Sequence, residues 1–239
     1  MDEKIETLTL ALQDIVDRFD GVSLSSSLGA EDMVLSHIVA QHKFPIEVFT
    51  LDTGRLHEDT YKLMDKVQSK YNNQLTVYFP EVNDLESFIN TQGVNAFYRS
   101  IDFRKLCCHI RKVEPLKRAL KNTEVWITGL RNQQSVTRQA IDEFSWDETF
   151  KLYKYNPLLS WSYEDVWQYI KENDVPYNAL HDRGFPSIGC SPCTRAINQG
   201  ENERAGRWWW ESPETKECGL HVAAIKIEAK EAKSEKVVV

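Results

Sequence analysis

The sequence lacks the features that would place it among membrane, secreted or nucleic-acid-binding proteins. No stretch of its 239 residues approaches the roughly 18 consecutive apolar residues of a membrane helix. The amino-terminal MDEKIETLTL is acidic and has no apolar run of the kind found in secretory signals. The net charge of −7 argues against general affinity for nucleic acid, which requires a basic surface. We therefore expect a cytoplasmic protein that binds neither membranes nor nucleic acids.

Cysteine is also scarce, with five in the chain, but four of the five form two close pairs. Cys107 and Cys108 are adjacent in KLCCHIRK, and Cys190 and Cys193 lie in GCSPC. In a reducing compartment, such pairs are more often metal-binding or redox-active than structural. Two pairs that converge on one site would supply four thiolates, the ligand set of zinc or of an iron–sulfur cluster.

The spacing of these cysteines favours a cluster over its alternatives. Structural zinc sites usually separate their cysteines by about two to four residues, so adjacent cysteines are unusual in them. The ligands of a cluster bind different irons and tolerate less regular spacing. Two unrelated buried cysteines beside an incidental CxxC are the structural alternative. The fifth cysteine, Cys218 in KECGLH, is a candidate reactive thiol or a plain surface cysteine.

Strand-like and helix-like segments alternate up to about residue 150. Apolar runs such as VSL, PIEVF, LTVYF and EVWIT indicate strands, and helical spacing recurs between them. This alternation predicts an α/β fold with a mostly parallel sheet and helices on both faces. In such sheets, ligands bind beyond the carboxyl ends of the strands. Three predicted strands end in the polar turns SSSLGAED, LDTGRLHE and TGLRNQQSVTR, so we expect the ligand there.

The pattern changes after about residue 150. SYEDVWQYIKEND predicts a helix with Ser162 as its N-cap. Residues from about 176 to 220 are rich in Gly, Pro, Trp, Cys and Arg with little periodicity, and a Lys/Glu/Ala tail follows. We therefore expect an irregular C-terminal segment after the α/β fold.

Taken in order, eight motifs resemble those of the assimilatory sulfonucleotide reductases, which act on adenylyl sulfate (APS) or phosphoadenylyl sulfate (PAPS). They are SSSLGAED, LDTGRLHEDTY, KLCCHIRKVEPLKRAL, GLRNQQSVTR, YNPLLSWSYEDVW, SIGCSPCTR, RWWWE and KECGLH. Within that family, the CC…CxxC set marks enzymes that carry a 4Fe-4S cluster and typically act on APS. The resemblance implies that one such cluster is held by Cys107, Cys108, Cys190 and Cys193.

The resemblance also implies the fold, the reaction and the partners. The fold would be that of the adenine nucleotide α-hydrolases, and the reaction would be reduction of APS to sulfite and AMP in assimilatory sulfate reduction. The Cys218 thiolate would attack the sulfate sulfur, displace AMP and leave a cysteine S-sulfonate. Thioredoxin or a similar dithiol would then release sulfite. A homo-oligomer is expected.

The substrate-binding residues implied by the resemblance would contact phosphate, sulfate and adenosine. Hydroxyls and N–H groups of a serine-rich turn at a helix N-terminus suit oxyanions, as do arginine side chains. The set comprises Ser25, Ser26, Ser27, Gly29, Leu51, Asp52, Thr53, Gly54, Lys112, Arg131, Arg138, Arg204, Arg207 and His221. Taken alone, each would be a plain turn residue or a solvated side chain. The turn is not a Walker loop, since no Gly-Lys-Ser/Thr follows it, so ATP hydrolysis is not expected.

Residues 1–199 are expected to form the α/β nucleotide- and cluster-binding domain, and residues 200–239 a C-terminal lid or tail that carries the reactive cysteine. Two other functions fit parts of the sequence. An adenylating or sulfur-transfer enzyme of the ATP pyrophosphatase type should carry an SGGxDS-like loop where this chain has SSSLGAED. A zinc-stabilised binding domain would keep the fold but would lack the visible absorption of a cluster.

Overall fold

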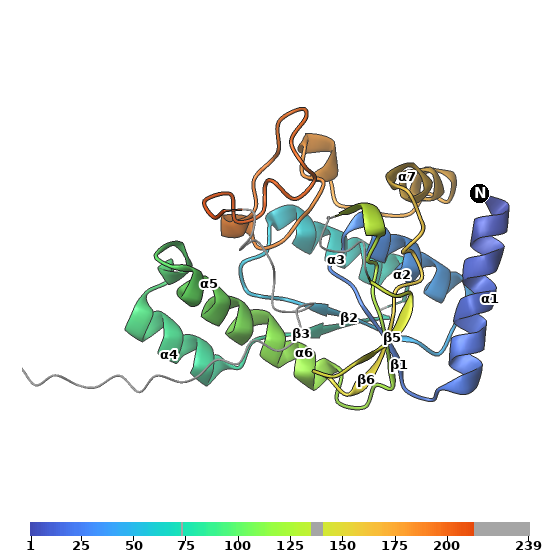
Figure 1. Cartoon of the computed structure of the whole chain (residues 1–239), viewed down its shortest axis with the longest axis horizontal. Coiled ribbons are helices and arrows are strands. Elements are labelled where there is room, and N and C mark those ends of the chain that lie inside the picture. Colours follow the sequence, from blue (N-terminus) through green and yellow to red (C-terminus); the bar gives the residue numbers. More distant parts are fainter. Residues whose placement is uncertain (73, 135–140, 213–239) are drawn as a thin grey trace, which may run out of the picture.

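A computed structural model describes residues 1–72, 74–134 and 141–212, and its centre is a six-stranded sheet (Figure 1). The strand order is β3-β2-β1-β4-β6-β5, with β5 antiparallel to β6 and every other neighbouring pair parallel. The strands are β1 (Val22–Ser25), β2 (Glu47–Leu51), β3 (Leu75–Tyr78), β4 (Val125–Ile127), β5 (Phe144–Asp147) and β6 (Leu152–Tyr155). The predicted α/β class with a mostly parallel sheet is therefore confirmed.

The helices occupy the segments between the strands, as their sequence periodicity predicts. The α-helices are α1 (Asp2–Arg18), α2 (Ala30–His42), α3 (Glu58–Lys70), α4 (Val82–Gln92), α5 (Ile101–Cys108), α6 (Glu114–Ala119) and α7 (Tyr163–Glu172). Shorter turns are η1 (Ala96–Tyr98), η2 (His109–Val113), η3 (Asn132–Gln134), η5 (His181–Arg183) and η6 (Ser191–Cys193). None of the helices described by the structure is long and apolar enough to cross a membrane.

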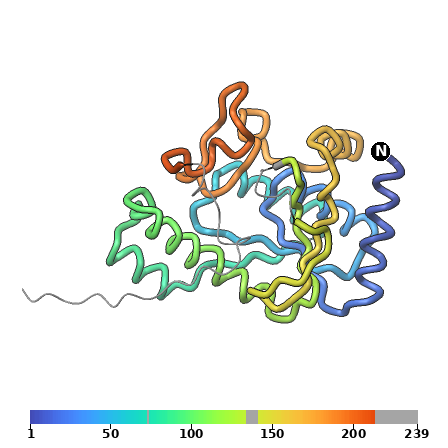
Figure 2. The backbone as a smooth tube through the Cα atoms, viewed as in Figure 1, coloured from blue at the N-terminus to red at the C-terminus, as the bar shows by residue number. Residues whose placement is uncertain are grey.

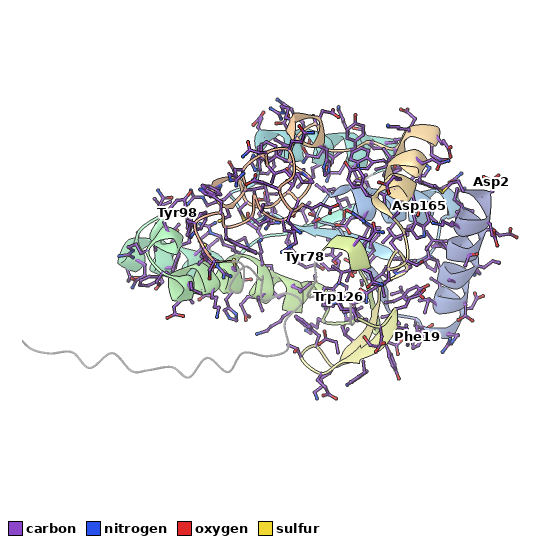
Figure 3. The ribbon with its side chains drawn as sticks, turned by 45° about the horizontal axis from the view of Figure 1, so that its top comes forward. Asp2, Phe19, Tyr78, Tyr98, Trp126 and Asp165 are labelled. Carbon is purple, nitrogen blue, oxygen red and sulfur yellow. The ribbon has the colours of Figure 1, made fainter. Side chains whose placement is uncertain are left out.

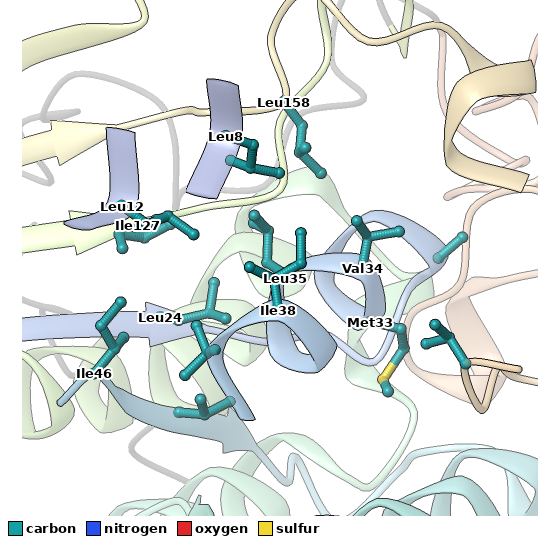
Figure 4. Close-up of a cluster of buried hydrophobic side chains, with 14 of the residues drawn as sticks. Leu8, Leu12, Leu24, Met33, Val34, Leu35, Ile38, Ile46, Ile127 and Leu158 are labelled. Atoms are coloured by element: carbon teal, nitrogen blue, oxygen red, sulfur yellow. The ribbon is translucent and has the colours of Figure 1, made fainter. Parts of the chain in front are cut away.

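Helices cover both faces of the sheet, as predicted. On one face, Leu24 of β1 and Ile127 of β4 belong to a large apolar core that also includes residues of α1, α2, α3 and α7 (Figure 4). On the other face, Phe49 of β2 and Trp126 of β4 pack against Leu116 of α6. Successive strand residues point to opposite faces, which is why the continuous apolar runs in the sequence serve two cores.

The β5–β6 hairpin at the sheet edge is absent from the sequence prediction. Its aromatic side chains Phe144 and Trp146 are largely exposed, and Tyr153 stacks on Phe144 with ring centroids 5.0 Å apart. The hairpin lies beside β4, so it extends the parallel sheet without changing the edge where the strands end.

The irregular segment after α7 crosses the carboxyl ends of the strands and lies beside η1 and α5 (Figures 1 and 2). Tyr98 of η1 is labelled in Figure 3. It donates a hydrogen bond to the carbonyl of Pro192 at 2.7 Å, and its ring centroid lies 4.5 Å from that of Trp210. A short antiparallel bridge joins Thr194 to Arg207 within the segment. Two stretches far apart in the sequence therefore form one wall above the sheet.

Candidate active site

A cavity of about 230 Å³ lies at the point where the strand order reverses, between β1 and β4. Crevices at such points, beyond the carboxyl ends of the strands, are the usual ligand sites of open α/β sheets. Its lining comes from the turn after β1, the ends of β2 and β4, the helix that follows α5, and the segment after α7. The predicted residues in this lining are Ser25, Ser26, Ser27, Gly29, Leu51, Thr53, Lys112, Arg204 and Arg207.

The serine-rich turn uses its own groups to fix its shape. The N–H of Ser26 donates to the Phe49 carbonyl at 2.7 Å, and the N–H of Leu28 to the Ser26 hydroxyl at 3.2 Å. The N–H groups of Ser27 and Gly29 likewise donate to Asp32 and to the Ser27 hydroxyl. These amides are therefore engaged inside the protein, and the turn contributes its serine hydroxyls and the N-terminus of α2 to the cavity.

Asp32, in the first turn of α2, fixes the serine-rich turn through hydrogen bonds. One carboxylate oxygen accepts the N–H and the hydroxyl of Ser27 at 2.7 and 2.6 Å. The other approaches Gly129 so closely that a Cβ there would lie 2.3 Å from it, so only glycine fits. Burial raises the pKa of Asp32 to about 6, against the hydrogen bonds from Ser27, which lower it.

Three carboxylates line the cavity beside the predicted cations, and none of them was expected from the sequence. They belong to Glu31, Asp32 and Glu203. Acidic residues are common in the first turn of any helix, so Glu31 and Asp32 carried no signal beyond that of a helix start. Arg131 is buried behind them, with its Nε donating to Glu31 at 2.7 Å and its Nη2 3.6 Å from Glu203. The predicted ligand Arg131 thus reaches the cavity through these two carboxylates.

Arg207 is the buried one of the three predicted cations in the cavity lining. Its Nη1 donates to the Ile188 carbonyl at 3.1 Å, and a Cβ on Gly189 would lie 2.3 Å from its Nη2. Its side chain is buried, and its Nε has no hydrogen-bond partner among the residues that the structure describes. A buried guanidinium in the wall of a cavity suits an oxyanion, which would complete its hydrogen bonds.

Two residues of the LDTG turn after β2 line the cavity, and the other two stabilise the turn itself. Leu51 and Thr53 line the cavity, whereas Asp52 and Gly54 lie outside its described lining. The Asp52 carboxylate accepts the N–H of Gly54 at 2.7 Å and the hydroxyl of Tyr61 at 2.9 Å. Gly54 has a φ of +67°, a conformation that favours glycine. Asp52 and Gly54 therefore shape the turn that presents their neighbours.

Three predicted site residues lie outside the described ranges: Arg138, Cys218 and His221.

A second, smaller cavity of about 20 Å³ brings the two cysteine pairs together. Cys107 and Cys108 come from the end of α5, Cys190 directly precedes η6, and Cys193 is the last residue of η6. All four pack in an apolar cluster with Phe97, Trp208 and Trp210. Cys190 and Lys112 line both cavities, so the two sites share a wall.

The helix that carries the first cysteine pair changes its winding directly after it. α5 continues into α6 through η2, a π-helical segment from His109 to Val113. Such segments are rare and are found most often at functional sites. This one contributes Arg111 and Lys112 to the lining of the cysteine cavity.

The surroundings of the cysteines are rich in donors. Burial raises the pKa of Cys193 to about 12, and it also raises the pKa of Cys107, with Arg111 acting in the opposite direction. Arg111 Nε and Trp208 Nε1 are buried, and neither has a hydrogen-bond acceptor within the described ranges. The cavity thus combines thiols, cationic side chains and unsatisfied N–H donors, which together suit an anionic group that offers acceptor atoms.

Comparisons with known proteins agree with these features. Residues 21–196 match the model of the phosphoadenosine phosphosulfate reductase domain. The adenosine 5′-phosphosulfate reductase of Burkholderia cepacia is 51% identical over 222 residues, covering 93% of this chain and 89% of the relative. That of Allochromatium vinosum is 49% identical over 210 residues, covering 88% and 82%.

The fold has a counterpart among solved structures. The crystal structure of phosphoadenylyl-sulfate reductase from Candida auris, a phosphate complex, superposes with a TM-score of 0.68 at 30% identity. The superposition covers 80% of this chain and 90% of the other. With the sequence match over most of its length, the chain belongs to the phosphoadenosine phosphosulfate reductase family.

Proposed function

We propose that the protein reduces APS to sulfite and AMP in assimilatory sulfate reduction. The observation that carries this proposal is the wall shared by the two cavities, to which Cys190 and Lys112 both contribute. One cavity offers hydroxyls and cations where a nucleotide would bind in this fold, and the other offers four thiols. The two relatives named above, which match this chain over most of its length, are adenosine 5′-phosphosulfate reductases.

The cysteine cavity fits a 4Fe-4S cluster better than a single metal ion. Within the described residues, no group of three His, Cys, Asp or Glu side chains could hold one ion. The thiolates of a cluster bind separate irons, so they need only surround a common space. The buried N–H groups of Arg111 and Trp208 would find acceptors in its sulfur atoms. We therefore infer that Cys107, Cys108, Cys190 and Cys193 are the four ligands.

When bound, the cluster would supply negative charge and a fixed shape to the shared wall. Lys112 lies on that wall and also lines the larger cavity, which we call the nucleotide cavity. A cation in this position would partly offset the charge of the cluster and attract the phosphate and sulfate of the substrate. The thiols bind metal as thiolates, so the raised pKa values of Cys107 and Cys193 make cluster assembly a proton-releasing step.

Cys218 is the proposed nucleophile. Its thiolate attacks the sulfate sulfur, the bond from that sulfur to the bridging oxygen breaks, and AMP leaves with the electron pair. The sulfur is left as a cysteine S-sulfonate. A thiolate of thioredoxin or a similar dithiol then attacks Cys218 Sγ and sulfite departs, after which the second donor thiol closes a disulfide. The dithiol is oxidised by two electrons, and sulfate sulfur is reduced to sulfite.

The remaining substrate contacts are proposed from the cavity lining and the family motifs. Arg204 and Arg207 would bind the phosphate and sulfate oxygens, while Leu51 and Thr53 would contact adenosine. Arg138 and His221 are proposed as further ligands on sequence grounds alone. The boundary between residues 199 and 200, the homo-oligomer and the cytoplasmic location stay predictions.

Protein purified without oxygen tests both parts of the proposal. We expect a broad visible absorption with about four irons per chain, and sulfite release from APS in the presence of reduced thioredoxin. With APS alone, intact mass should show one added sulfonate group, absent from Cys218→Ser although that variant keeps its colour. A colourless, zinc-loaded and inactive protein would support the binding-domain hypothesis. An adduct on one of the paired cysteines would require nucleophile and ligands to be reassigned together.

A further inference from the structure

Trp208 has an unusual backbone conformation for a large residue. Its φ is +41°, in the left-handed region that L-residues rarely adopt, and its side chain is 1% exposed. Its N–H donates to the carbonyl of Cys193 at 3.1 Å. A bulky residue keeps a strained conformation only where its surroundings fix it, and such positions cluster at functional sites.

Two guanidinium groups lie over the Trp208 indole. The Cζ atom of Arg104 is 4.8 Å from the ring centroid, and that of Arg207 is 4.9 Å from it. Arg104 belongs to α5 and lines the cysteine cavity, whereas Arg207 lines the nucleotide cavity. One aromatic ring therefore contacts a cation from each cavity.

Glu211 fixes the Arg104 end of this arrangement. Its two carboxylate oxygens accept Arg104 Nε at 2.9 Å and Arg104 Nη2 at 2.8 Å, and both side chains are buried. A buried bidentate pair is strongly oriented, and removal of one partner leaves an uncompensated charge. The pair joins the chain just after Trp208 to α5. Arg104 lies three residues before Cys107 in that helix.

The position of the Arg207 guanidinium is defined by packing. The bare Cα of Gly189 leaves room for its guanidinium, and the carbonyl of Ile188 accepts one of its N–H groups. Both contacts restrain the guanidinium, and the indole is a further surface against which it packs. Loss of the indole would let the buried guanidinium move within the space that the ring had filled.

We propose that Trp208 and Glu211 are positioning residues, which hold Arg207 in the nucleotide cavity and make its placement depend on α5. The assignment of Arg207 as an oxyanion ligand rests on the proposed function. The consequence is that nucleotide affinity should respond to changes in the buried pair Arg104–Glu211, of which Arg104 lines the cysteine cavity.

Binding of AMP to the cluster-loaded protein, measured by titration calorimetry, tests this inference without turnover. Trp208→Leu should weaken AMP binding by roughly tenfold, the scale of one misplaced charged contact. Trp208→Phe keeps a ring beneath the guanidinium and should restore the affinity to within about twofold. Trp209→Leu is the matched control, because Trp209 is 40% exposed, and it should bind AMP like the wild type.

Glu211→Gln provides a second route if Trp208→Leu fails to fold. It keeps the shape of the side chain but removes the charge, so AMP should bind several-fold more weakly at an unchanged iron content. Normal AMP affinity in both Trp208→Leu and Glu211→Gln would overturn the inference. The proposed function fails separately, if the wild type binds AMP but releases no sulfite from APS.

Discussion

At the scale of single residues, the carboxyl group of Asp32 is buried in surroundings that disfavour its ionised form. Its pKa is raised from 3.8 to about 6 by burial, so the folded protein binds this proton more tightly than the unfolded chain does. The resulting stabilisation is complete below pH 3.8 and is lost as the pH rises through about 6. Above that pH, the ionised carboxylate is kept buried by its hydrogen bonds from Ser27.

We therefore expect Asp32→Asn to change how stability depends on pH. Asparagine can still accept from Ser27 but does not titrate, so the variant should lack the fall that the wild type shows between about pH 4 and pH 6. The difference between the two profiles should be at most about 3 kcal/mol, the equivalent of two pKa units. Urea denaturation at a series of pH values measures it, with Asp84→Asn on the exposed face of α4 as control. Parallel profiles for wild type and Asp32→Asn would contradict the prediction.

Gly189 should be needed for nucleotide binding without touching the nucleotide. A Cβ there would lie 2.3 Å from Arg207 Nη2, and the guanidinium would have to move away. Gly189→Ala should therefore weaken AMP binding by roughly tenfold, with only a modest change in melting temperature, because the end of a side chain can shift where backbone cannot. Ser160→Ala serves as control, since Ser160 is exposed and lies outside the lining of the cavity. Equal AMP affinity in Gly189→Ala and wild type would show that Arg207 is not held as described.

The sequence anticipates residues whose type alone suits the chemistry and misses those that depend on three-dimensional placement. Ser25 and Arg207, which the family motifs imply as substrate ligands, line the cavity. Glu203 was not anticipated, because an acid beside an anion site is contrary to simple charge matching. Arg104 was not anticipated either, because nothing in the local sequence shows that Glu211, 107 residues later, will pair with it.

At the scale of secondary structure elements, strands with uniform apolar runs were predictable and the edge hairpin was not. β4 is buried on both faces and its sequence VWI is continuously apolar, and β2 has the buried run Val48–Thr50 with a single polar residue in it. β6 contains Lys154, which is buried with its ammonium 4.6 Å from the centroid of the Trp126 ring. A lysine in that position interrupts the apolar pattern that indicates a buried strand. Its burial is favourable only in the folded chain, where the Trp126 ring lies beside the ammonium.

The π-helical turn η2 is an element that composition does not reveal. HIRKV is compatible with an ordinary α-helix, and its flanks α5 and α6 are α-helical. The wider turn follows from what surrounds it, including the carbonyl of Thr53, to which Arg111 donates a hydrogen bond. Tertiary contacts of this kind override the local helical preference. Such turns are therefore frequent at functional sites but cannot be predicted from the local sequence.

The N-terminus of α7 offers a test of local stability that is independent of the site. Ser162 Oγ accepts the N–H of Asp165 at 3.1 Å, and the Asp165 carboxylate accepts the N–H of Ser162 at 2.8 Å. Ser162→Ala removes one half of this capping box and should lower the free energy of unfolding by about 1 kcal/mol. Urea denaturation checks the value, with the exposed Ser160→Ala as control. A loss of AMP binding in Ser162→Ala would show that α7 contributes to the site.

At the scale of the whole molecule, the cysteine pairs join two regions that are far apart in sequence. Cys108 ends a helix that continues onto one face of the sheet, whereas Cys193 lies in the segment that crosses the strand ends. Their cavity shares a wall with the nucleotide cavity. A group bound by both pairs would therefore hold together the helical layer, the crossing segment and one side of the ligand site.

This arrangement predicts that loss of the proposed cluster weakens the whole fold. Cys193→Ser should purify without visible colour and with a lower melting temperature, because metal binding that requires the folded chain stabilises it. A loss of about 3 kcal/mol would lower the melting temperature by roughly 6–12 °C in a chain of this size. Cys108→Ser should behave alike, since both pairs are needed to close the site. Cys218→Ser is the matched control, which should keep colour and stability. A coloured Cys193→Ser with wild-type stability would show that Cys193 binds no iron, and the ligand set would then have to be sought elsewhere.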